Sequence, residues 1–147
     1  MEQMLENKEV KKQFVFPNIE SEMGEIERVA ATFSSEDQGA FIGRFIEKAK
    51  IASLSPLSEE IWSKLENTDS FGILAGDWNE VEYHAKAEPV LRDWQGLRAK
   101  IEDGKPMDAP IIARLKDTLH LVSGNTRLMV SRAARIRPEV LIVNMDE

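Results

Sequence analysis

Apolar residues in the first two thirds of the chain recur every three or four positions, which is the spacing of one face of a helix. Ser34-Ser35 end the first such stripe, and Ser35 with Gln38 forms a capping box for the next helix. Pro56 fits the first position of a third helix, where a proline loses no hydrogen bond. We expect helices over residues 19–33, 38–49, 56–66, 78–87 and 89–103, the last closed by Gly104.

The spacing of apolar residues changes from helical to extended after Gly104. Two strand-like runs are separated only by Lys116-Asp117 and therefore predict a hairpin, which a turn, a helix and a final strand follow. This order predicts an α+β fold, in which a helical region packs on a small mixed sheet at the C-terminal end. We expect a loose arm at 1–17, the helical region at 18–96 and an α/β unit at 97–147, with strands at 110–115, 118–123 and 139–143.

The chain has 147 residues, enough for one domain with a proper core. It contains no cysteine, which excludes disulfides, thiolate metal ligands and cysteine nucleophiles. No apolar run approaches the roughly 20 residues needed to cross a bilayer, and the N-terminus lacks the pattern of a secretory signal. We therefore expect a cytoplasmic protein that has no membrane partner.

The formal charge of −7 is unevenly distributed. Residues 1–104 carry 12 Lys/Arg and 21 Asp/Glu, whereas residues 105–147 carry 7 and 5. An acidic body repels nucleic acid, so a polyanion is expected to approach through the C-terminal segment. The acidic helical region is instead a candidate surface for a protein partner, and a merely solvated face is the alternative interpretation.

The turn Gly124-Asn125-Thr126-Arg127 has the clearest chemical use. Glycine lets the backbone approach a ligand, and the helix that starts here leaves amide N–H groups without internal partners. Thr126 can donate its hydroxyl to a phosphate oxygen, and a solvent-facing Arg127 can supply a bidentate contact that sets affinity. Arg132 extends the basic strip along the same helix. In the purely structural alternative, Arg127 forms a salt bridge to the acidic helical region.

The ordered motifs around this turn resemble the ParB/sulfiredoxin superfamily over the C-terminal third of the chain. A helix ending at Gly104 precedes the apolar strand that begins Pro110-Ile111-Ile112, a hairpin follows, and the turn Gly124-Asn125-Thr126-Arg127 has the family's "G-x-x-R" form. A helix and a strand after Pro138 complete the pattern. The resemblance implies a ParB/sulfiredoxin-like sheet and a phosphate-binding turn, with a nucleotide or a nucleic-acid phosphate as ligand.

Two positions in the turn depart from the best-known members of that superfamily. Thr126 stands where ParB proteins carry a second arginine, which argues against CTP-driven clamping on DNA. Asn125 stands where sulfiredoxins carry the catalytic cysteine, so sulfiredoxin activity is excluded. The turn is closer to the "GHTR" form of ParB-like kinases and nuclease-like relatives. Phosphate binding is the property that all these relatives imply.

Three classes of function follow from these features. A phosphate-binding module needs only the turn Gly124-Asn125-Thr126-Arg127, and its ligand would be a nucleoside di- or triphosphate with Mg²⁺, or nucleic acid. A metal-dependent nuclease or phosphotransferase also needs an acid near the turn, and Asp77 and Glu80 are the candidate catalytic residues. Asp77 as a helix cap is the structural alternative. In an acidic inhibitory protein, the third class, the turn would be vestigial.

Overall fold

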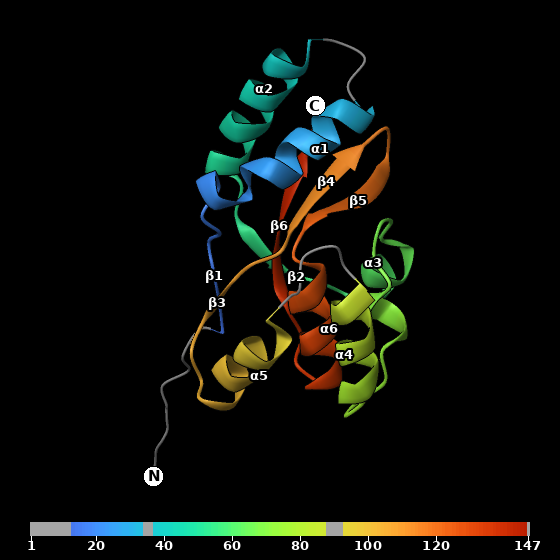
Figure 1. Ribbon diagram of the computed structural model, residues 1–147. Coiled ribbons are helices and arrows are strands. Elements are labelled where there is room, and N and C mark those ends of the chain that lie inside the picture. Colours follow the sequence, from blue (N-terminus) through green and yellow to red (C-terminus); the bar gives the residue numbers. More distant parts are fainter. Residues whose placement is uncertain (1–12, 34–36, 88–92, 147) are drawn as a thin grey trace.

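The computed structural model describes residues 13–33, 37–87 and 93–146. Six α-helices and a four-stranded mixed sheet in these residues confirm the expected α+β class (Figure 1). The helices are α1 (Met23–Phe33), α2 (Gln38–Ile51), α3 (Glu59–Lys64), α4 (Trp78–Ala87), α5 (Trp94–Glu102) and α6 (Asn125–Ala133), with short 3-10 helices η1 (Glu20–Glu22) and η2 (Ser70–Gly72). The strands are β1 (Phe14–Val15), β2 (Leu54–Pro56), β3 (Met107–Asp108), β4 (Ile111–Leu115), β5 (Thr118–Ser123) and β6 (Glu139–Asn144).

The main sheet has the strand order β2-β6-β4-β5. Strands β4 and β5 form the predicted antiparallel hairpin, and Lys116 and Asp117 at its turn have φ angles of 51° and 65°. Such left-handed pairs are typical of two-residue hairpin turns, because their twist matches that of the strands. From β5 the chain passes through α6 to β6, which runs parallel to β4. The turn at Gly124 therefore connects an edge strand of the main sheet, β5, to helix α6.

Helices cover both faces of this sheet, so its strands are apolar on both sides. Ile111 and Ala113 of β4 belong to a core cluster with α1 and α2, whereas Ile112 belongs to a second cluster with α3 and α6. All three residues are fully buried. Further apolar contacts join α4 and α5 to α6. In Figure 1, α1 and α2 occupy the upper part of the view and α3 to α6 the lower part.

The prediction of a helix starting at Pro56 was wrong. Residues Leu54–Pro56 form the edge strand β2, antiparallel to β6, and α3 begins only at Glu59. Ser58 caps that helix, since its side chain accepts a hydrogen bond from the Ile61 N–H. A proline is tolerated at a sheet edge because it has no N–H to contribute to the ladder. The short strand carries too few residues to show an alternating pattern.

The described part of the N-terminal arm is anchored to the rest of the fold. Phe14 is buried, and β1 pairs in parallel with β3 to form a separate two-stranded sheet. Residues 1–12 lie outside the described part of the chain, as do the expected cap residue Ser35 and the expected helix start at Pro89. The described caps of α2 and α5 are Asp37 and Asp93, whose side chains accept hydrogen bonds from backbone N–H groups. No helix in the described segments has the length and hydropathy needed to cross a membrane.

Candidate functional site

Gly124 lies between β5 and α6 in a conformation that favours glycine. Its φ angle is 107°, in the left-handed region, and a Cβ placed on it would lie 2.7 Å from Pro110 Cβ and 2.9 Å from Pro110 Cα. Both distances are shorter than any ordinary carbon contact, so backbone shape and space each require a glycine. The turn is therefore packed directly against the start of β4.

The first amides of α6 have no hydrogen-bond acceptor among the described residues. The earliest backbone bond of the helix runs from the Leu128 N–H to the Gly124 carbonyl, at 2.9 Å, and Gly124 has no side chain to cap the helix. The N–H groups of Asn125, Thr126 and Arg127 are left over, and they carry the positive end of the helix dipole. Such a helix start favours an anion.

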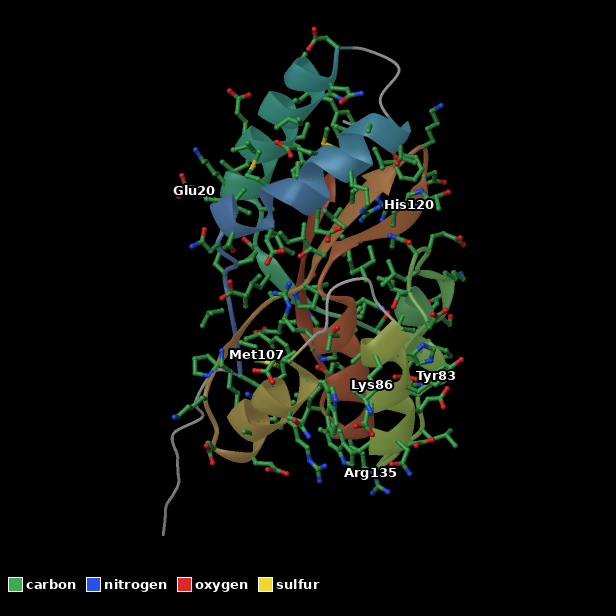
Figure 2. The ribbon with its side chains drawn as sticks, in the orientation of Figure 1. Glu20, Tyr83, Lys86, Met107, His120 and Arg135 are labelled. Atoms are coloured by element: carbon green, nitrogen blue, oxygen red, sulfur yellow. The ribbon has the colours of Figure 1, made fainter. Side chains whose placement is uncertain are left out.

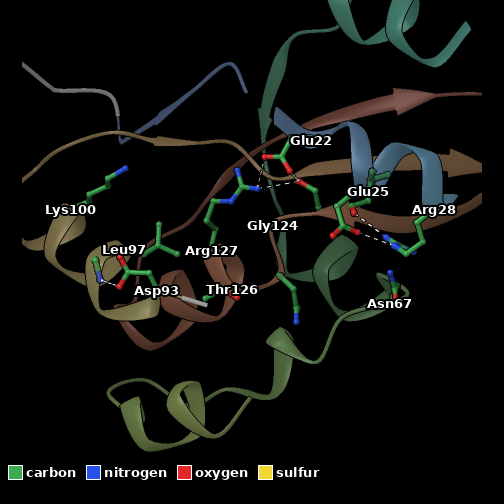
Figure 3. A pocket seen from close by; sticks show the side chains of 14 residues that line it. Glu22, Glu25, Arg28, Asn67, Asp93, Leu97, Lys100, Gly124, Thr126 and Arg127 are labelled. Carbon is green, nitrogen blue, oxygen red and sulfur yellow. Dashed lines mark hydrogen bonds and ion pairs between the residues drawn. The ribbon is translucent and has the colours of Figure 1, made fainter. Parts of the chain in front are cut away.

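These residues line a cavity of about 680 Å³. Four of the five predicted ligand-binding residues, Gly124 to Arg127, form one part of its wall (Figure 3). The remainder comes from η1 and α1, from the loop after α3, from the end of β5, and from α5 with its cap. Those further lining residues are Glu22, Glu25, Arg28, Asn67, Asp93, Gly96, Leu97, Lys100, Val122 and Ser123.

Arg127 is mostly buried, which contradicts the expectation that it faces solvent. Its side chain is 14% exposed and forms an ion pair with the 16% exposed carboxylate of Glu22, at 3.2 Å. The guanidinium also donates to the Ser123 hydroxyl at 3.1 Å and to the carbonyl of Asp108 at 2.8 Å. Ser123 in turn donates to Glu22 at 2.7 Å. Figure 3 shows the Arg127 guanidinium pointing toward the Glu22 carboxylate. The salt bridge of the structural alternative is thus present, while Arg127 still lines the cavity.

A chain of side-chain hydrogen bonds holds Asn125. The Thr68 hydroxyl donates to Asn125 Oδ1 at 2.5 Å, Thr68 and Ser70 share a hydrogen bond of 2.7 Å, and Trp62 Nε1 donates to Ser70 at 2.8 Å. The Thr68 hydroxyl has a single proton, which it donates to Asn125. The Ser70 hydroxyl is therefore the donor in its bond with Thr68. The donor and the acceptor of each of these hydrogen bonds are therefore fixed, and the two Asn125 Nδ2 protons remain available to a ligand in the cavity.

Replacing Thr68 with valine is expected to lower the free energy of unfolding by about 1–3 kcal/mol. The substitution keeps the shape but leaves Ser70 and Asn125 without a half-buried partner. The matched control is Thr32→Val, because Thr32 bonds only a helix carbonyl on an exposed surface. Urea unfolding of both variants measures the difference, and equal losses would contradict a special role for the chain of hydrogen bonds.

The sequence did not indicate which individual charged residues of the helical region lie beside the turn. Arg28 pairs with Glu25 at 2.9 Å and donates to the Val122 carbonyl at 3.0 Å. Glu22, Glu25 and Arg28 are spaced by three residues and so form a polar stripe along one side of the segment 19–33. That stripe was the available signal. Nothing in the sequence indicated which neighbour it would face.

The remaining predicted site residues lie elsewhere. Arg132 is near the other end of α6, where it donates to the Phe71 carbonyl at 3.0 Å and pairs with Glu59 at 2.6 Å. Asp77 caps α4 by accepting from the Glu80 N–H at 3.1 Å, as its structural interpretation required, and Glu80 pairs with His84 at 3.3 Å. Neither acid lines the cavity. Over residues 13–33, 37–87 and 93–146, no three histidine or acidic side chains converge as metal ligands would.

The cavity can therefore hold an anion at one wall and make polar and apolar contacts at the others. No protein-family model, curated protein or solved structure matches the chain. The resemblance to the ParB/sulfiredoxin superfamily stays a prediction, and the function has to be argued from the geometry of the cavity.

Proposed function

We propose that this protein binds a nucleoside di- or triphosphate in the cavity beside Gly124-Asn125-Thr126-Arg127. The observation that carries the proposal is the set of three unpartnered amides at the start of α6, on residues that line the cavity. Helix starts of this kind hold phosphate groups through their N–H donors and their dipole. The resemblance of the turn to the phosphate-binding "G-x-x-R" motif supports the same ligand class.

The rest of the cavity suits the remainder of a nucleotide. Its volume of about 680 Å³ falls within the range of cavities that take small ligands. Lys100 adds positive charge and Arg28 adds a guanidinium that pairs with Glu25, while Leu97 and Val122 provide apolar surface for a base. Asn67 and Asn125 supply amide groups of the kind that recognise base edges or sugar hydroxyls. The phosphates would lie at the helix start and the base towards the apolar wall.

A thermal-shift screen with nucleoside di- and triphosphates, with and without Mg²⁺, tests the proposal. A ligand that binds only the folded state at 100 times its Kd stabilises that state by about 2.7 kcal/mol, which raises Tm by several degrees. The corresponding nucleosides, which lack phosphate, are the control and should give a much smaller shift. A cooperative melting transition whose Tm no nucleotide raises would contradict the proposal.

Metal-dependent phosphotransfer or nuclease chemistry is the second candidate, because carboxylates line the same cavity. These are Glu22, Glu25 and Asp93, rather than the predicted Asp77 and Glu80. A carboxylate beside bound phosphates can hold the Mg²⁺ that such reactions need. Release of inorganic phosphate from a bound triphosphate in the presence of Mg²⁺, and its loss in Glu25→Gln, would favour catalysis. Binding without turnover would favour the binding module.

A further inference from the structure

Three arginines gather at the C-terminal end of α6, away from the Gly124 turn. Figure 2 labels Arg135 at the lower end of the molecule, just past this helix. The arginines line a second, smaller cavity of about 190 Å³. Its lining residues are Glu59, Trp62, Arg132, Arg135, Ile136 and Arg137. Three positive charges and one negative charge meet there, in a chain whose formal charge is −7.

Only one of these arginines is neutralised within the described residues. Arg132 pairs with Glu59 at 2.6 Å, and its guanidinium lies over the Trp62 and Phe71 rings, 4.9 and 4.3 Å from their centroids. Arg132 therefore serves the packing between α3 and α6. Arg135 and Arg137 are exposed, and no acceptor in the segments that the structure describes bonds their side chains. Two positive charges at the cavity are available to a partner.

Arg135 occupies a backbone position where glycine is the favoured residue. Its φ angle is 62°, and it follows the last turn of α6 in a motif with bonds from the Ile136 N–H to the Ser131 carbonyl, at 3.0 Å, and from the Arg135 N–H to the Arg132 carbonyl, at 3.2 Å. Helices with this ending usually have glycine at the left-handed position, because a Cβ there is strained. A strained residue whose side chain makes no hydrogen bond or ion pair within the described segments points to a function outside the fold.

We infer that the cavity at the end of α6 binds backbone phosphates of a nucleic-acid strand. The cavity is far smaller than those that enclose drug-sized ligands, so it can take a phosphate group but not the base and sugar with it. Guanidinium groups match phosphate oxygens in a bidentate geometry. Arg135 and Arg137 are at most about 7 Å apart along the chain, so their long side chains can contact neighbouring phosphates of one strand. The inference uses none of the residues of the proposed nucleotide cavity.

The test is fluorescence anisotropy with a labelled 20-nucleotide single strand and the matching duplex, at 50 and 200 mM salt. Wild-type protein is expected to bind at low salt and to lose affinity as salt rises, since phosphate contacts release counterions. Arg135→Gly and Arg137→Gln should each weaken binding by roughly five- to tenfold and lower the salt slope by about one. Arg135→Gly should at the same time raise Tm by roughly 4 °C, because it relieves the strained φ.

Lys116→Gly is the matched control. Lys116 also has a positive φ, of 51°, and also carries one positive charge, but it lies in the β4–β5 turn and does not line the cavity. The control should change charge and stability in the same direction as Arg135→Gly and leave oligonucleotide binding unchanged. Equal losses in both variants, or wild-type protein that binds neither oligonucleotide at 50 mM salt, would overturn the inference. Binding of a phosphoserine peptide in place of the oligonucleotides would also overturn it.

Discussion

Replacing Arg127 with alanine is expected to lower the free energy of unfolding by about 3 kcal/mol, which is a large part of the stability of a small domain. The change leaves the mostly buried carboxylate of Glu22 without its cation and removes the donor to the Asp108 carbonyl. If a nucleotide binds as proposed, its affinity should also fall about ten- to a hundredfold, because a charge-assisted bond is lost. Urea unfolding and isothermal titration below the Tm of the variant measure the two effects.

Two variants make the experiment on Arg127 specific. Arg28→Ala removes an arginine of the same cavity whose side chain is 42% exposed and pairs with Glu25, so the stability loss should stay below about 1 kcal/mol. Glu22→Gln keeps the size of the side chain and removes only its charge, so it should destabilise less than Arg127→Ala. A folded Arg127→Ala protein with wild-type stability would contradict the structural role, and one with wild-type nucleotide affinity would contradict the proposed site.

Gly124→Ala is expected to destabilise the protein by about 2–4 kcal/mol. The new methyl group would meet Pro110 at 2.7 Å, and alanine is strained at a φ angle of 107°. The control is Gly43→Ala in the middle of α2, where an added Cβ meets nothing within 4 Å and helix propensity should stabilise the protein by up to about 1 kcal/mol. Thermal unfolding of both variants gives the comparison. Equal Tm values would mean that the turn tolerates a side chain.

The sequence predicted the elements near Gly124 better than their surroundings. The hairpin at Lys116-Asp117 and the turn at Gly124 have local signals, namely an alternating pattern and residues that accept left-handed backbone. Strand β2 has no such signal, because it has only three residues and the last of them, Pro56, fits the start of a helix equally well. Its strand state comes from pairing with β6, which lies some 85 positions later in the chain.

For the same reason, the sequence predicted only one part of the candidate site. The turn from Gly124 to Arg127 is contiguous, so its residue types alone indicated an anion site. Glu22 and Arg28 reach the cavity only because α1 packs against β5. The pattern of residues within one helix carries no information about the element on which that helix packs. The burial of Arg127 follows from that packing too. A contact between residues more than one hundred positions apart depends on the whole fold and cannot be predicted from either segment alone.

The ion pair between Arg127 and Glu22 also bears on how the chain reaches its folded state during synthesis. Its residues are 105 positions apart, and β1 likewise cannot pair until β3 has been synthesised. At roughly 5–20 residues per second, the N-terminal segment leaves the ribosome about 5–20 seconds before the residues that complete these contacts. Phe14 and the apolar faces of α1 and α2 have no sheet to cover them during that interval. The nascent protein therefore passes through a stage in which apolar surface is accessible to chaperones, and this surface is covered only once the residues from β3 onward have been made.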